Sequence, residues 1–171
     1  DIVQRIDAQG WRHVPGSDAA TGPRVAVYGC SFTYGTGLAD TETFTSLAQA
    51  ARPHVRILNR GIGGHGTVQN ALQFRRDLAA QRVDAAIFAL ISDHRFRNIA
   101  HPQRMRQYLS REWYDLGVEH VPVARMDSRG AVRIAYVPIW QPVMRDADFQ
   151  VFLPDDHMID TASLAVLDFV R

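Results

Sequence analysis

The chain contains no lysine, a single cysteine and no long hydrophobic run. Its 19 basic side chains are all Arg and face 18 acidic ones, so the formal net charge is +1. A balance this close to neutral gives no strong field to attract nucleic acid or a membrane surface. The lone Cys30 excludes an intrachain disulfide, and no apolar stretch approaches the length of a membrane span. We therefore predict no nucleic-acid partner and no stable membrane insertion of the given chain.

Length and composition are those of one globular domain. The 171 residues are 46% hydrophobic and 22% charged, which is enough to bury a sizeable core. Residues 1–23 are polar and rich in turn formers and are predicted to be an N-terminal arm, with the domain over 24–171. The chain opens on Asp1 rather than Met, so we expect that upstream sequence, with any targeting signal, has been removed. Compartment and oligomeric state stay open.

Strands and helices are predicted to alternate through the first half of the chain. Short apolar runs at Val25–Tyr28, Val55–Leu58 and Val83–Ile91 predict strands, and helical spacing of apolar residues marks Thr41–Arg52 and Thr67–Gln81. The third run is almost wholly apolar, as in a strand covered on both faces. This order predicts βαβ units and an α/β fold with a mainly parallel, doubly wound sheet.

The second half is predicted to be less regular. His120–Arg125 and Ala131–Val137 alternate around a turn-forming segment and predict a hairpin. Helical patterns cover residues 102–116 and Thr161–Val170, and residues 138–154 look irregular. We find no further strand–helix unit that would widen the sheet. Either the sheet is small, or a segment near 138–154 is missing or shortened.

Chemistry-bearing residues follow the predicted strands. Ser31 comes directly after the first strand, where open α/β sheets bind their ligands. A serine needs a base within hydrogen-bond reach and a third group to orient that base. Asp155 and His157, just before the last predicted helix, can supply both from one loop. The glycine turn at 61–66 offers backbone N–H groups to a developing oxyanion.

The glycine turn has a second interpretation. Residues 61–66 match G-x-G-x-x-G after a strand and before a helix, which is the dinucleotide-binding pattern. That pattern requires an acidic residue at the end of the next strand. Asp84 stands at the start of that strand, and Asp93 lies rather far along. A nucleotide-binding α/β domain is therefore kept as an alternative.

Three segments resemble the sequence blocks of the SGNH (GDSL-type) hydrolases. They are Gly29-Cys-Ser-Phe-Thr-Tyr-Gly35, Asn59-x-Gly-x-x-Gly64 and Asp155-x-His157. The resemblance implies a flavodoxin-like three-layer α/β/α sandwich that cleaves esters, often by removing acyl groups, acetyl included, from small molecules, lipids or carbohydrates. It also implies a bacterial protein that uses no metal or organic cofactor.

Carried over by position, the resemblance assigns roles to individual residues. Ser31 would be the nucleophile, His157 the base and Asp155 its orienter, with the N–H groups of Ser31 and Gly64 in the oxyanion hole. The family's third block normally adds an Asn to that hole, whereas this chain has Ser92. A Ser hydroxyl also donates one hydrogen bond, but it is shorter and rotates freely. Losing such a donor costs roughly 10²–10³ in rate, so a catalytically weakened binding domain is a further alternative.

Other polar residues near these segments are candidates for contact with substrate. His65 lies in the glycine turn, and Asp93 and His94 follow the third strand. Solvated loops would explain their positions equally well. Cys30 is predicted to be a small buried residue rather than the nucleophile. No metal site is predicted, since four further histidines lack ligand-like spacing: His13, His54, His101 and His120.

Overall fold

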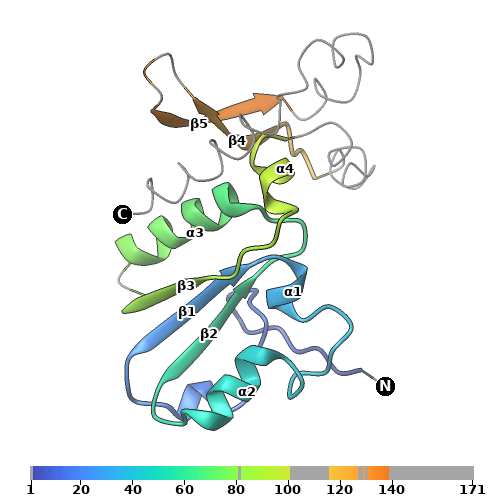
Figure 1. The fold of residues 1–171 in the computed structure, drawn as a ribbon. Coiled ribbons are helices and arrows are strands. Elements are labelled where there is room, and N and C mark those ends of the chain that lie inside the picture. Colours follow the sequence, from blue (N-terminus) through green and yellow to red (C-terminus); the bar gives the residue numbers. More distant parts are fainter. Residues whose placement is uncertain (1, 81, 101–115, 127–128, 130, 139–171) are drawn as a thin grey trace. The chain divides into compact units, whose positions relative to one another are not determined.

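The structure, a computed structural model, describes residues 2–80, 82–100, 116–126, 129 and 131–138 (Figure 1). These residues fall into two compact units. The first comprises the described residues of Asp1–His65 and Leu72–Leu90, and the second those of Gly66–Ala71 and Ile91–Arg171. Each unit is described by itself below. No helix in the described ranges is long and apolar enough to cross a membrane.

The first unit is built on a three-stranded parallel sheet. Strand β1 (Arg24–Gly29) lies in the middle, with β2 (Arg56–Gly61) on one side and β3 (Ala85–Phe88) on the other. Strands β1 and β2 pair in register over their full length, from Arg24 opposite Arg56 to Gly29 opposite Gly61. The prediction of a parallel sheet is therefore confirmed for the described residues.

Helix α3 (Thr67–Ala79) covers one face of this sheet with aromatic contacts. The ring of Tyr28 packs edge-on to Phe74 at 5.8 Å and stacks on Phe88 at 5.4 Å between centroids. The Tyr28 hydroxyl donates a hydrogen bond of 2.9 Å to Asp77. These rings form one core cluster with Ala26, Leu58 and Val83.

The opposite face carries α1 (Ser31–Tyr34) and α2 (Phe44–Ala51) and is held by polar contacts. The buried Asn59 of β2 donates from Nδ2 to the Thr33 carbonyl at 2.7 Å and to Thr45 Oγ1 at 3.0 Å. Figure 1 shows α2 and α3 on opposite sides of the sheet. The three-layer sandwich of the whole chain stays a prediction, because residues 139–171 lie outside the described ranges.

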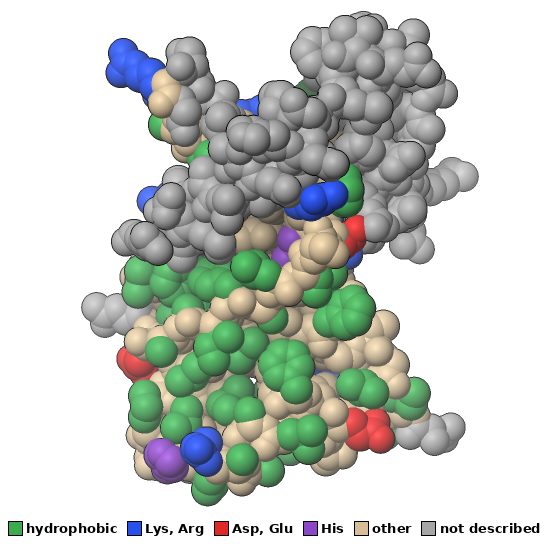
Figure 2. Space-filling view, viewed as in Figure 1, with side chains coloured by type: hydrophobic (Ala, Val, Ile, Leu, Met, Phe, Trp, Pro, Cys, Tyr) green, Lys and Arg blue, Asp and Glu red, His purple; other side chains and the backbone are tan. Residues whose placement is uncertain are grey.

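Helix α2 buries its polar residues and exposes its apolar ones. Thr45, Ser46 and Gln49 are buried, whereas Phe44 and Leu47 are 47% and 60% exposed. Gln49 explains this orientation, because its Oε1 accepts from the Ile57 N–H of β2 at 2.9 Å and its Nε2 donates to a nearby backbone carbonyl. Hydrophobic side chains accordingly cover much of the visible face of the first unit (Figure 2).

Two predicted strands have different bounds in the structure. The run at Val83–Ile91 forms a strand only over Ala85–Phe88, and its residues alternate between exposed and half-buried. The prediction of a strand covered on both faces is wrong for the described residues, because every second residue of β3 is exposed. The second strand continues through Gly61, beyond the predicted end at Leu58, since its last residues pair with β1.

The N-terminal residues belong to the first unit. A short 3₁₀ helix, η1 (Ser17–Ala19), leads toward β1. Arg12 forms an isolated antiparallel bridge with Asn59 at the outer edge of β2. Its buried guanidinium pairs with Asp40 at 3.1 Å, and its Nη2 donates to the Leu38 carbonyl. These contacts fasten the segment before β1 to the sheet.

The second unit contains the predicted hairpin. Strands β4 (His120–Met126) and β5 (Val132–Pro138) pair antiparallel, and Val121 and Val123 form a small core with Ala100. A short helix, α4 (His94–Asn98), was not predicted. The predicted helices at 102–116 and Thr161–Val170, and the irregular segment 138–154, fall outside the described residues except at residues 116 and 138.

Candidate active site

Ser31 stands where the central strand of the sheet ends and a helix begins. Strand β1 finishes at Gly29, Cys30 is the extended residue before the helix, and Ser31 is the first residue of α1. The Ser31 carbonyl accepts from the Gly35 N–H at 2.9 Å, which closes this single helical turn. Ser31 is half-buried. Its position at the carboxyl edge of a parallel sheet is where such folds bind ligands.

Glycines at the ends of β1 and β2 allow α1 to pack directly on the strands. A Cβ at Gly29 would collide with the Thr33 side chain, and one at Gly61 would collide with the backbone of Thr33 and Tyr34. The Ile62 N–H donates to the Gly29 carbonyl at 3.1 Å, so the segments leaving the two strands run side by side. The glycine turn and the turn of Ser31 therefore adjoin in the first unit.

The glycine turn presents two backbone N–H groups, those of Gly63 and Gly64, that no described residue accepts from. Its backbone is bent by Gly64, whose φ is +80°, and closed by a 3.2 Å hydrogen bond from His65 N–H to the Ile62 carbonyl. In the described part of the chain, neither Gly63 nor Gly64 donates its N–H to an acceptor, and neither does the Ser31 N–H. A positive φ is strained for residues with a side chain, which accounts for glycine at position 64.

Ser92, Asp93 and His94 belong to the second unit, whereas Ser31, Gly64 and His65 belong to the first. Ser92 is exposed. The Asp93 carboxylate accepts two hydrogen-bonded contacts from Arg97 one turn later, at 2.8 and 2.7 Å. His94 is buried, with 2% of its surface exposed, so it is not a residue of a solvated loop. Asp155 and His157 lie outside the described residues, and their roles stay predictions.

Two asparagines that shape these loops have no role assigned to them by the sequence analysis. Asn59 accepts from the Gly61 N–H at 2.9 Å in addition to its contacts with α1 and α2. Its signal was available, since an amide at the end of an apolar strand needs partners. Asn98 accepts from the Val68 N–H in the first turn of α3 at 3.1 Å. No sequence signal identified it, because α4 was not predicted.

A hydrogen-bonded ion pair of the sheet, Arg24 with Asp84, lies at the opposite edge from Ser31. Asp84, just before β3, accepts from both the backbone and the guanidinium of Arg24 at 2.8–3.0 Å. These hydrogen bonds lower the pKa of Asp84 to about 2. A dinucleotide site requires its acidic residue at the carboxyl edge instead, so this geometry disfavours that alternative. Among the described residues, no group of three or more His, Cys, Asp or Glu could hold a metal ion.

Cys30 is buried beside the nucleophile candidate. It is 1% exposed and forms no disulfide. A thiol needs access to its substrate and an electropositive setting to react. The prediction of a small buried residue at this position is confirmed.

Comparisons with known proteins found few matches. No family model matches the chain, and no curated protein does so. Among solved structures, AlinE4, an SGNH-hydrolase family esterase, is similar with 24% identity and a TM-score of 0.40 over 61% of this chain and 58% of that one. Two single-residue mutants of the same esterase match at 22% and 23% identity with the same TM-score. The chain spans under three fifths of the length of these esterases, and likeness at this level does not establish a family.

Proposed function

We propose that the chain is a serine-dependent ester hydrolase of SGNH type, which removes an acyl group from a small-molecule, lipid or carbohydrate ester. The observation that carries the proposal is the position of Ser31. It opens a helix at the end of the central strand, beside a glycine turn in which the N–H groups of Gly63 and Gly64 have no acceptor among the described residues. A nucleophile next to preorganised donors is what acyl transfer requires.

In the proposed reaction, Ser31 Oγ attacks the ester carbonyl while His157 takes its proton, with Asp155 orienting the imidazole. The N–H groups of Ser31 and Gly64, and the Ser92 hydroxyl, donate to the tetrahedral oxyanion. The intermediate collapses, the C–O bond to the alcohol breaks, and His157 protonates the departing oxygen. Water then attacks the acyl-enzyme with His157 again as base, which releases the acid and restores Ser31.

Local rigidity supports this assignment. Oxyanion donors act without reorganisation only when the backbone that carries them is fixed in advance. Asn59 holds α1 through the Thr33 carbonyl and the start of the glycine turn through the Gly61 N–H. One buried amide therefore ties both proposed donor segments to β2.

A binding domain without catalysis is the second candidate, and the residues around Ser92 favour it. The hydroxyl at position 92 is exposed, and the neighbouring Asp93 is committed to Arg97. A binding domain would take up an ester ligand at the Ser31 edge and leave it intact.

Hydrolysis of a short-chain nitrophenyl ester separates the two candidates. We expect activity in the wild type and in Cys30→Ala, and a loss of at least about 10³-fold in Ser31→Ala, because removing the nucleophile abolishes the covalent route. Cys30 is the matched control, since it is the adjacent residue with a similar side chain. A folded wild type without activity, or equal activity in Ser31→Ala, would contradict the proposal.

A further inference from the structure

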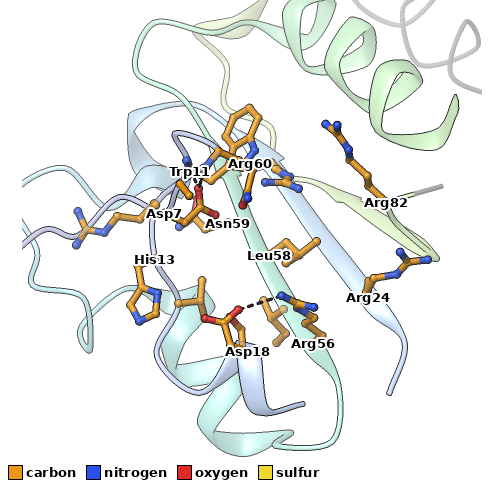
Figure 3. Close-up of a pocket in the computed structure, with 16 residues that line it drawn as sticks. Asp7, Trp11, His13, Asp18, Arg24, Arg56, Leu58, Asn59, Arg60 and Arg82 are labelled. Atoms are coloured by element: carbon orange, nitrogen blue, oxygen red, sulfur yellow. Dashed lines mark hydrogen bonds and ion pairs between the residues drawn. The ribbon is translucent and has the colours of Figure 1, made fainter. Parts of the chain in front are cut away.

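The first unit contains a cavity of about 590 Å³ that the proposed reaction does not use (Figure 3). It lies between the N-terminal residues 7–18 and strand β2, and neither Ser31 nor Gly64 lines it. Its volume is within the range of small-molecule sites. Arg56, Leu58 and Arg60 line it from alternate positions of β2, which places them on the same face of the sheet.

Two of the arginines in this cavity are neutralised by carboxylates of their own. Arg24 is held by Asp84 through two side-chain hydrogen bonds. Arg56 donates a single hydrogen bond of 2.9 Å to Asp18, whose side chain is 76% exposed. Exposed pairs of this kind contribute little to stability and exchange readily for another anion.

Two further arginines share one carboxylate. Asp77 is buried and lies 3.2 Å from Arg60 Nε but 3.8 Å from Arg82 Nη1, and it also accepts from the Tyr28 hydroxyl. Among the described residues, Arg60 and Arg82 therefore have one ion-pair partner between them. The Arg82 side chain is 60% exposed, and among the described residues its guanidinium has only this 3.8 Å contact with Asp77, so most of its donors face solvent.

The Arg60 side chain is fixed by the Trp11 ring and by Asp77. Its guanidinium lies 4.5 Å from the centroid of the Trp11 ring, and its side chain is only 8% exposed. A planar guanidinium that is stacked and fixed loses little entropy when it binds a further oxygen. The other acidic lining residue at this end, Asp7, has its Oδ1 occupied by the backbone N–H groups of Gln9 and Trp11.

We propose that this cavity binds a small molecule through a multiply charged oxyanion, a phosphate or a polycarboxylate, held by Arg56, Arg60 and Arg82. Guanidinium forks bind such groups with two parallel hydrogen bonds each. The anion would replace the exposed Asp18 on Arg56 and accept from the exposed donors of Arg82. The site is independent of Ser31, so it stands whether or not the chain hydrolyses esters.

Isothermal titration calorimetry at low ionic strength tests this, with pyrophosphate and citrate as probes of the two kinds of oxyanion. We expect one saturable site for at least one probe, with affinity that falls as salt is added. Arg82→Gln and Arg56→Gln should each weaken binding by about tenfold, the effect of losing one charge-assisted contact. Both side chains are partly exposed, so both variants should fold.

Arg52→Gln is the matched control. Arg52 is exposed and follows α2, its guanidinium donates to the Ala51 carbonyl, and it does not line the cavity. Binding unchanged in Arg52→Gln and in Ser31→Ala supports the site. Absence of a saturable heat with both probes, or equal weakening in Arg52→Gln and Arg82→Gln, would overturn it. Binding by only one probe identifies which oxyanion the cavity prefers.

Discussion

Replacing Asn59 with Ala removes three hydrogen bonds at the base of the proposed active site. The amide donates to the Thr33 carbonyl at 2.7 Å and to Thr45 Oγ1 at 3.0 Å, and it accepts from the Gly61 N–H at 2.9 Å. Each buried hydrogen bond contributes about 1 kcal/mol net to stability. We therefore expect Asn59→Ala to lower the free energy of unfolding by about 3 kcal/mol.

Asn70 provides the matched control. It is 0% exposed, and neither atom of its amide has a hydrogen-bond partner among the described residues. Asn70→Ala deletes the same atoms from an equally buried position without breaking a hydrogen bond. We expect it to change the free energy of unfolding by less than about 1 kcal/mol, because only packing is lost while an unsatisfied amide is removed.

Urea unfolding followed by circular dichroism measures both variants. A second readout is the rate at which Ser31 reacts with a phosphonate, which should fall in Asn59→Ala because α1 and the glycine turn lose their common anchor. Equal destabilisation by the two substitutions, within about 0.5 kcal/mol, would refute the view that Asn59 acts through its hydrogen bonds.

Three further predictions concern the same unit. Gly61→Ala should destabilise by about 1–3 kcal/mol through overpacking against the backbone of α1, whereas Gly63→Ala, with open space around its Cβ, should be near neutral in the same urea assay. Pairing with Arg24 lowers the pKa of Asp84 from 3.8 to about 2. The pair's contribution to the free energy of unfolding is therefore complete above about pH 4 and lost as the pH falls through about 2. Unfolding measured across this acid range should show the dependence in the wild type and not in Asp84→Asn. Leu47→Gln should change stability by under about 0.5 kcal/mol, since this side chain faces solvent, and a loss above about 2 kcal/mol would place it in the core instead.

The parallel sheet could be predicted from the sequence, and its details could not. Alternating apolar runs and helical segments identify βαβ units, which is why β1 and β2 were located. The bounds of β2 were missed because pairing with β1, rather than local propensity, keeps Asn59 through Gly61 in the strand. Tertiary context also decides the face that a helix buries, and in α2 the amide of Gln49 outweighs the apolar Phe44 and Leu47.

The candidate site was predictable in part for a related reason. Ser31 was recognisable because a nucleophile directly after a buried strand falls at a sheet edge, whichever residues surround it. An amide at the end of an apolar strand indicates that Asn59 has partners, but these lie 14 and 26 positions away, and no local pattern identifies them. The arginine cavity is equally non-local, since it joins N-terminal residues to β2 and Arg82.

The most direct measurement of the central claim is the site of covalent labelling by a serine-reactive phosphonate. The intact protein would be treated with the reagent, digested, and mapped by mass spectrometry, alongside Ser31→Ala and Cys30→Ala. Our account predicts one adduct per chain, on Ser31, retained in Cys30→Ala and absent from Ser31→Ala. An adduct on another residue, or none on a folded wild type, would contradict it.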